Sequence, residues 1–145
     1  MNVEIRPFHQ SDLEDLLDIW ETASKYAHPF LSDDFLKKER ENIPNLYLPN
    51  ADTWVATVED KVIGFIALLG NEIGALFVDP AHHGQGHGTA LCNKAKTLHE
   101  ELFVSVFKEN RSGRRFYDRY GFKFVKECIF EQTGDMLLKL HIQSA

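Results

Sequence analysis

Cysteine is scarce in this sequence, with only Cys92 and Cys128 among 145 residues. Small secreted proteins held together by disulfides contain many more, so these two are expected to be buried thiols in a predicted helix and a predicted strand. Long apolar runs are also missing, and the N-terminus lacks the charged and apolar regions of a signal peptide. We therefore expect a cytoplasmic protein without a membrane partner.

Basic residues are in the minority, because 16 lysines and arginines stand against 22 aspartates and glutamates, for a net charge of −6. A nucleic-acid surface needs clustered positive charge, so no nucleic acid partner is expected. An acidic surface suits a cationic amine, although it is also ordinary for a soluble protein. Hydrophobic residues make up 43% of the chain, and the length fits one compact domain, residues 1–145.

Helical and strand patterns alternate along the chain without an internal repeat or a linker. Ser11 is expected to cap a first helix that ends before Pro29, and Ser32 a second helix that Pro44 disturbs. A hairpin turn is expected at residues 59–61. Expected strands span residues 3–6, 54–58, 62–69, 73–78, 102–107, 122–130 and 136–142, and further helices span 88–101 and 111–120. This alternation predicts an α/β or α+β fold.

The most informative segment is LFVDPAHHGQGHGTAL, residues 76–91. An apolar run ends at a proline, three glycines follow at alternate positions, and a helical pattern begins behind them. Glycines at this spacing allow a tight turn whose N–H groups point into one hollow, next to the positive end of a helix, which suits a diphosphate. A P-loop is excluded because Gly88 is followed by Thr89 and Ala90 rather than lysine, and the G-x-G-x-x-G spacing of dinucleotide-binding loops is absent.

A second segment, NRSGRRFYDRYGF, spans residues 110–122. Together the two segments resemble motifs A and B of the GNAT superfamily of acyl-CoA-dependent N-acetyltransferases, in particular its small single-domain members. In motif A, Gln/Arg-x-x-Gly-x-Gly/Ala, His83 takes the place of the glutamine or arginine, while Gly86 and Gly88 match. In motif B, Gly113 replaces the usual alanine, which weakens a helix by about 1 kcal/mol.

The resemblance implies the family's mixed, mostly antiparallel, twisted sheet flanked by helices, and acetyl-CoA as cosubstrate. Backbone groups of Phe77 and Val78 are then expected to pair with the pantetheine chain. Asn110 is expected to bind the pantetheine, to cap its own helix, or to do both. The residues expected to hold the cofactor are Leu76, Phe77, Val78, His83, Gly84, Gln85, Gly86, His87, Gly88, Thr89, Asn110 and Tyr117.

An amine that attacks a thioester must first lose a proton, since a lysine-like amine with a pKa of about 10.4 is mostly protonated at neutral pH. Glu72, at the start of the strand before the glycine loop, is the candidate base. The alternative is that Glu72 is an ordinary solvated turn residue, and that water or a histidine acts as the base. Tyr117 is the candidate acid for the departing thiolate, because the resembling family has a tyrosine there; the alternative is a core tyrosine. Direct attack is expected, because neither motif contains a cysteine.

The residues that bind the acceptor amine are the hardest part of the site to predict from the sequence. The resembling family recognises its amine between the first two helices, where this chain has His28, Phe30 and Leu31, and Trp54 on the neighbouring hairpin could add an aromatic wall. The expected acceptor is a small-molecule or peptide amine, and the expected protein is a monomer or a homodimer. A non-catalytic acyl-CoA-binding module stays open as an alternative.

Histidines cluster in the glycine loop, at His82, His83 and His87. H-E-x-x-H is absent, and a diphosphate in the loop leaves little room for a closed zinc centre. We therefore expect no metal.

Overall fold

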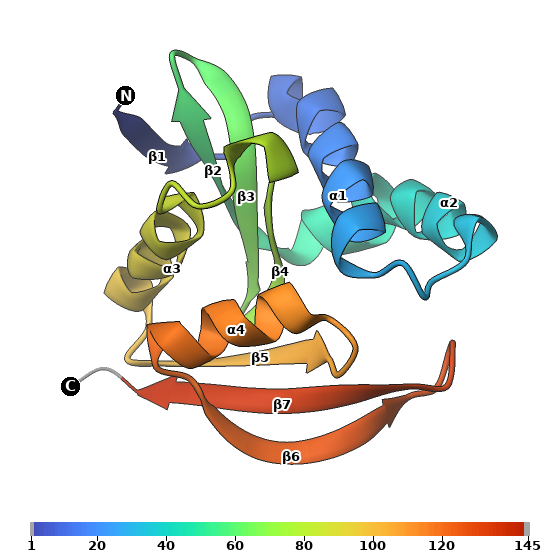
Figure 1. The fold of residues 1–145 in the computed structure, drawn as a ribbon. Helices are drawn as coiled ribbons and strands as arrows, with labels where there is room; N and C mark the ends of the chain where they lie inside the picture. Colours follow the sequence, from blue (N-terminus) through green and yellow to red (C-terminus); the bar gives the residue numbers. More distant parts are fainter. Residues whose placement is uncertain (1, 144–145) are drawn as a thin grey trace.

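The protein is built on one sheet of seven strands, in the order β1-β2-β3-β4-β5-β7-β6 (Figure 1). The structure, a computed structural model, describes residues 2–143. Neighbouring strands are antiparallel except β4 and β5, which run parallel, so the mixed, mostly antiparallel sheet expected from the resemblance is confirmed. The strands are Val3–Pro7 (β1), Asp52–Val58 (β2), Lys61–Leu69 (β3), Glu72–Val78 (β4), Glu101–Phe107 (β5), Lys123–Phe130 (β6) and Asp135–Gln143 (β7).

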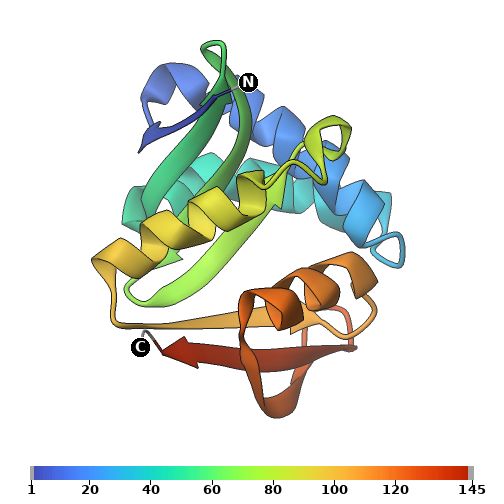
Figure 2. The ribbon, with the colours of Figure 1, turned by 60° about the vertical axis from the view of Figure 1, so that its left-hand side comes forward.

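Helices cover both faces of the sheet. They are Leu13–Ala27 (α1), Asp33–Asn42 (α2), His87–Leu98 (α3) and Arg111–Tyr120 (α4). α3 and α4 lie on one face, and α1 and α2 lie on the other (Figure 2). Each face has its own core: Leu91 and Cys92 of α3 belong to one apolar cluster, and Leu16 and Leu17 of α1 belong to the other.

The sheet opens in its middle, between β4 and β5. These strands pair only at Glu72 with Phe103 and at Ile73 with Val104, although both continue for several residues. A bulge at Gly74 accompanies the separation, because Leu68 pairs with Ile73 while Ala67 pairs with Ala75. Bulges bend the strand that carries them, so β4 turns away from β5. The carboxyl ends of two parallel strands therefore have unpaired facing edges.

Several expected element ends are corrected. Ser11 is not the cap of α1, because the Asp12 carboxylate accepts the His9 N–H at 2.8 Å and two Arg6 guanidinium bonds at 2.8 and 2.9 Å. These bonds stabilise a 3₁₀ turn at Gln10–Asp12, so α1 starts only at Leu13. α3 ends at Leu98 rather than residue 101, since Glu101 already pairs with β7. After Asn42 the second helix changes to a π-helical turn that contains Pro44.

Candidate active site

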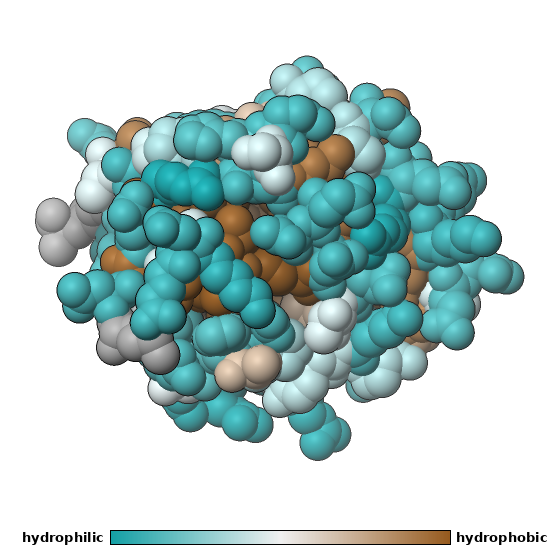
Figure 3. Space-filling model, turned by 90° about the horizontal axis from the view of Figure 1, so that it is seen from above, coloured by the Kyte–Doolittle hydropathy of each residue, from teal (hydrophilic) through white to brown (hydrophobic). Residues whose placement is uncertain are grey.

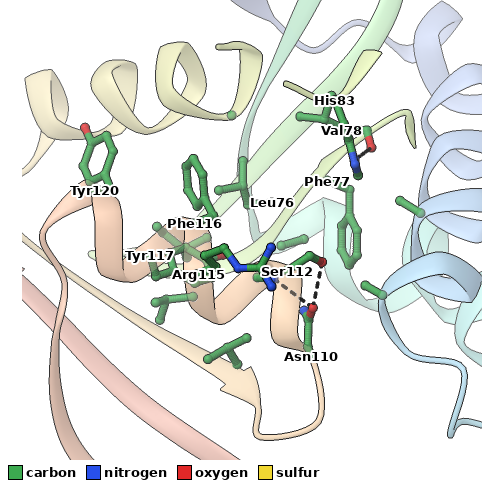
Figure 4. Close-up of a pocket in the computed structure, with 18 of the residues that line it drawn as sticks. Leu76, Phe77, Val78, His83, Asn110, Ser112, Arg115, Phe116, Tyr117 and Tyr120 are labelled. Atoms are coloured by element: carbon green, nitrogen blue, oxygen red, sulfur yellow. Dashed lines mark hydrogen bonds between the residues drawn. The ribbon is translucent and has the colours of Figure 1, made fainter. Parts of the chain in front are cut away.

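A cavity of about 830 Å³ lies where β4 and β5 separate. Its walls come from β4, β5, the glycine loop and helices α1, α3 and α4 (Figure 4). On the face of the molecule that is seen from above in Figure 3, apolar residues gather in the middle and hydrophilic residues surround them. The two sequence motifs, which are separated by β5, therefore meet at one cavity.

The glycine loop has the backbone conformation that its sequence predicts. Gly84 and Gly86 have φ angles of 77° and 84°, in the left-handed region that favours glycine. Gly88 lies close to α4, because a Cβ there would be 3.1 Å from Cε1 of Phe116 and the ring would have to shift slightly to admit it. α3 begins directly behind the loop, and no side chain caps its N-terminus at Gly86. Its first N–H groups are thus available to an anion, with the positive end of the helix dipole behind them.

The loop histidines brace the loop from within. His83 Nε2 lies 2.9 Å from the Val78 carbonyl oxygen, and the His83 ring meets Tyr26 edge-on at 5.3 Å. His87 is buried, with Nε2 3.1 Å from Oε1 of Gln85, and burial, followed by the neighbouring His82, lowers its pKa. Gln85 itself does not line the cavity. Side chains of the loop are therefore engaged with protein groups, which leaves the backbone N–H groups for a ligand.

Tyr117 lies between α4 and the sheet and is only 6% exposed. Its ring packs edge-on against Phe116 at 5.3 Å and Phe122 at 5.2 Å. Tyr117 lines the cavity. Its hydroxyl forms no hydrogen bond with the described residues, and its oxygen is not completely shielded from solvent. Burial, followed by the neighbouring Cys92, raises the pKa of Tyr117. The phenol therefore stays protonated and can donate its proton into the cavity.

Asn110 links the start of α4 to His28. Its Oδ1 caps α4 by accepting the Gly113 N–H at 2.9 Å, and its Nδ2 lies 3.3 Å from Nε2 of His28. The departure from the family motif has a structural reason, because a Cβ at Gly113 would lie 2.5 Å from Nδ2 of Asn110. Glycine at this position thus permits the Asn110 conformation that reaches His28.

The His28 end of the cavity is aromatic. The His28 ring is edge-on to Phe30 at 5.7 Å, Phe77 at 6.3 Å and Phe107 at 4.9 Å. Burial lowers the pKa of His28 to about 4, so the imidazole is neutral at pH 7. His28, Phe77 and Phe107 line the cavity; Phe30 supports them from behind, and neither Phe30 nor Leu31 reaches the lining.

Trp54 is not part of this site, which corrects the expectation of an aromatic wall from the hairpin. Its ring packs with the α3-side core and lies under the Lys94 ammonium at 4.2 Å, and its Nε1 donates to Asp52 at 3.1 Å. The side chain lies on the wrong face of the sheet, because strand alternation sends Val55 rather than Trp54 toward α1.

Glu72 adjoins the cavity without lining it. Ile73 packs in the α3-side core, whereas Ala75 and Phe77, beyond the bulge, pack against the α1-side core. Since successive side chains of a strand alternate, Glu72 lies on the same face as Ala75 and Phe77. This is the face of α1 and His28, although Glu72 begins β4 and the Phe77 that contacts His28 is near its other end.

Several lining residues were not expected from the sequence. They are Ala23, Tyr26 and Ala27 of α1, Val104 to Phe107 of β5, and Ser112, Gly113, Arg115, Phe116, Arg119 and Tyr120 of α4, with Ile73, Gly74 and Ala75 of β4 and His82. The four-residue spacing of Arg115 and Arg119 was the available signal for one shared helix face. The contributions of α1 and β5 depend on tertiary packing and left no local pattern.

The described residues offer neither a metal site nor a reactive thiol in the cavity. Within residues 2–143, no group of three or more histidine, cysteine, aspartate or glutamate side chains could hold a metal ion. Cys92 is buried outside the cavity lining, and burial raises the pKa of its thiol to about 12.

Within residues 2–143, no helix is both long and apolar enough to span a membrane.

Comparison with known proteins agrees with this geometry. The sequence profile of the acetyltransferase (GNAT) domain matches residues 49–124. Peptidyl-lysine N-acetyltransferase YjaB of Salmonella typhimurium is 37% identical over 135 residues, 92% of each chain. Peptidyl-lysine N-acetyltransferase YiaC of Escherichia coli is 29% identical over 133 residues, 91% of this chain and 90% of that protein. The solution structure of apo-form YjaB from Escherichia coli, 31% identical, superposes with a TM-score of 0.89 over 100% of both chains.

The chain belongs to the GNAT family of acetyltransferases. It is an acyl-CoA-dependent N-acetyltransferase that transfers the acetyl group of acetyl-CoA to an amine, as the two motifs predicted. The alternative of a non-catalytic acyl-CoA-binding module is not supported by these relatives.

Proposed function

We propose that this enzyme acetylates the side-chain amine of lysine in peptides or proteins, by direct attack of the amine on acetyl-CoA. The relatives named as peptidyl-lysine N-acetyltransferases support the acceptor class. The observation that carries the mechanism is the protonated, unpaired Tyr117 hydroxyl in the cavity between β4 and β5.

The donor is held by the glycine loop and by the open edge of the sheet. N–H groups of the loop and of the first turn of α3 bind the diphosphate. The pantetheine chain then runs between the separated strands, where the backbone of Phe77 and Val78 offers unpaired groups on the β5 side. This path leads the thioester from the loop toward Tyr117 and the His28 end of the cavity.

The acceptor enters at the aromatic end of the cavity. The aliphatic stem of a lysine packs against Phe77 and Phe107, whose ring faces also attract its ammonium group. A neutral His28 does not repel that cation, and Asn110 holds the imidazole in place. The net charge of −6 adds a general attraction for a basic peptide.

The reaction needs one proton acceptor and one proton donor. Glu72 takes the ammonium proton through intervening water, because its carboxylate adjoins the cavity on the acceptor face. The amine lone pair then attacks the thioester carbonyl, the attached nitrogen loses its second proton to water, and the tetrahedral intermediate becomes the amide as its C–S bond breaks. Tyr117 gives its hydroxyl proton to the departing sulfur, whose thiol has a pKa near 8.5, and recovers it from solvent.

We propose that residues 1–145 work as one domain, alone or as a homodimer, in the cytoplasm. The single seven-stranded sheet supports one folding unit. The free thiols Cys92 and Cys128 fit a reducing compartment.

Three matched peptides test the acceptor. The first has a blocked N-terminus and one lysine, the second has arginine in place of that lysine, and the third has a free N-terminus and no lysine. With acetyl-CoA and the enzyme, mass spectrometry is expected to find an added acetyl group on the first peptide only. Acetylation confined to the third peptide would assign the enzyme to α-amines instead, and none on any peptide would refute the peptide acceptor.

A further inference from the structure

Two arginines of α4 differ from the other arginines of the chain. The sequence has six, of which Arg6 and Arg40 are held in ion pairs, Arg114 donates to the Lys108 carbonyl oxygen at 3.0 Å, and Arg111 lies outside the cavity lining. Arg115 and Arg119 line the cavity and form no ion pair or side-chain hydrogen bond with the described residues. They are four residues apart, so their guanidinium groups extend from one face of the helix. Figure 4 shows Arg115 among the side chains that α4 contributes.

The packing of α4 brings this face next to the glycine loop. Phe116, adjacent to Arg115, contacts the Gly88 position at the start of α3. Tyr120, adjacent to Arg119, donates its hydroxyl to Oδ1 of Asn93 on α3 at 2.7 Å. Arg115 and Arg119 therefore lie on the α4 wall of the cavity whose lining also includes the glycine loop and the first residues of α3.

Positive charge at this place is unusual for an acidic protein. The chain carries a net charge of −6, yet Lys96 adds a further cation near the Tyr120 ring, at 5.6 Å. Asp118, the carboxylate within the same helical turn, makes no ion pair with either arginine. An unpaired pair of guanidinium groups on a ligand cavity is suited to a phosphate, which arginine binds in a bidentate manner.

We propose that Arg115 and Arg119 bind the 3′-phosphate of coenzyme A, and so make the enzyme selective for CoA over its 3′-dephospho form. This inference rests on the donor site of the proposed function. Coenzyme A carries a diphosphate and, joined to it only through the ribose, a phosphomonoester that has close to two negative charges at neutral pH. The loop N–H groups bind the diphosphate, and the α4 arginines line the same cavity, where they receive the second group.

Calorimetric titration with CoA and with 3′-dephospho-CoA tests this assignment. The proteins are the wild type, the double variant Arg115→Gln/Arg119→Gln, and the control Arg111→Gln. Arg111 is on the same helix and carries the same charge but does not line the cavity, so it controls for the general electrostatic field. The wild type and the control are expected to bind CoA about tenfold or more tightly than 3′-dephospho-CoA, as for a charge-assisted contact.

In the double variant this preference is expected to disappear. Its affinity for CoA falls by about tenfold or more, while its affinity for 3′-dephospho-CoA stays within about twofold of the wild type. Equal affinity of the wild type for both ligands, or an equal loss of both in the double variant, would overturn the proposal. Failure of the wild type to bind either ligand would instead refute the donor site itself.

Discussion

Replacing Tyr117 by phenylalanine removes the proposed proton donor and leaves the ring in place. The hydroxyl has no hydrogen-bond partner among the described residues, and the ring contacts with Phe116 and Phe122 do not depend on it. No buried partner is left unsatisfied, so the free energy of unfolding should change by only about 0.5 kcal/mol. A change in activity can then be assigned to chemistry rather than to folding.

The size of the loss follows from the proton transfer. General acid catalysis contributes about 10²- to 10⁴-fold to a rate. Burial raises the pKa of Tyr117, so transfer of its proton to a thiolate whose conjugate acid has a pKa near 8.5 is uphill. We therefore expect the lower end of the range, a fall of about 10²-fold in kcat.

Release of free thiol from saturating acetyl-CoA, with a saturating lysine peptide, measures kcat directly. The control is Tyr47→Phe, because the Tyr47 hydroxyl bonds to Glu39 on α2, outside the cavity lining. CoA affinity, measured by calorimetry, should be unchanged in both variants. A Tyr117→Phe enzyme that keeps more than about a third of the wild-type kcat would refute the role of the hydroxyl as the acid.

Three further changes test the rest of the site. Glu72→Gln should lower kcat by about 10²-fold without weakening CoA binding, while Glu100→Gln, an exposed carboxylate before β5, should have no effect; equal activities of the two in a thiol-release assay would exclude Glu72 as the base. His28 has a folded-state pKa of about 4 against about 6.5 unfolded, so the unfolded chain binds more protons between these values. Stability should therefore fall by up to about 3 kcal/mol as the pH drops from 6.5 to 4, and denaturant titrations of His28→Gln should lack this component. Gly113→Ala should not show the gain of about 1 kcal/mol expected from helix propensity, because the new methyl group displaces Asn110; a rise in Tm with an unchanged His28 pKa by NMR would contradict this.

Local patterns in the sequence were sufficient to predict the turn of the glycine loop and the bounds of helix α4. The backbone of Gly84 and Gly86 must adopt left-handed angles, and helix α4 has the predicted bounds because Asn110 caps it and Gly121 ends it at a φ of 117°. These features depend on residues that are close in the chain, so their spacing alone identifies them. The hairpin of β2 and β3 was predictable for the same reason.

The acceptor half depends on contacts that no local pattern contains. His28 and Asn110 meet at 3.3 Å although they are 82 positions apart. The face on which Trp54 lies is set by the pairing register of β2, which a short apolar run does not fix. Likewise, the bulge at Gly74 decides which side chains of β4 share a face with Glu72. A glycine inside a strand is compatible with a bulge, but it does not determine whether one forms.

The separation of β4 from β5 reverses the usual distribution of rigidity in a sheet. In most sheets the central strands exchange their amide hydrogens last, because both edges are bonded. Here β4 and β5 are joined by just two residue pairs, so the two halves of the sheet are expected to separate most easily in its middle. A pantetheine chain that hydrogen-bonds to the unpaired edges of β4 and β5 would join the two halves of the sheet more firmly. Each release of CoA would remove these bonds and loosen the halves again for the next cycle.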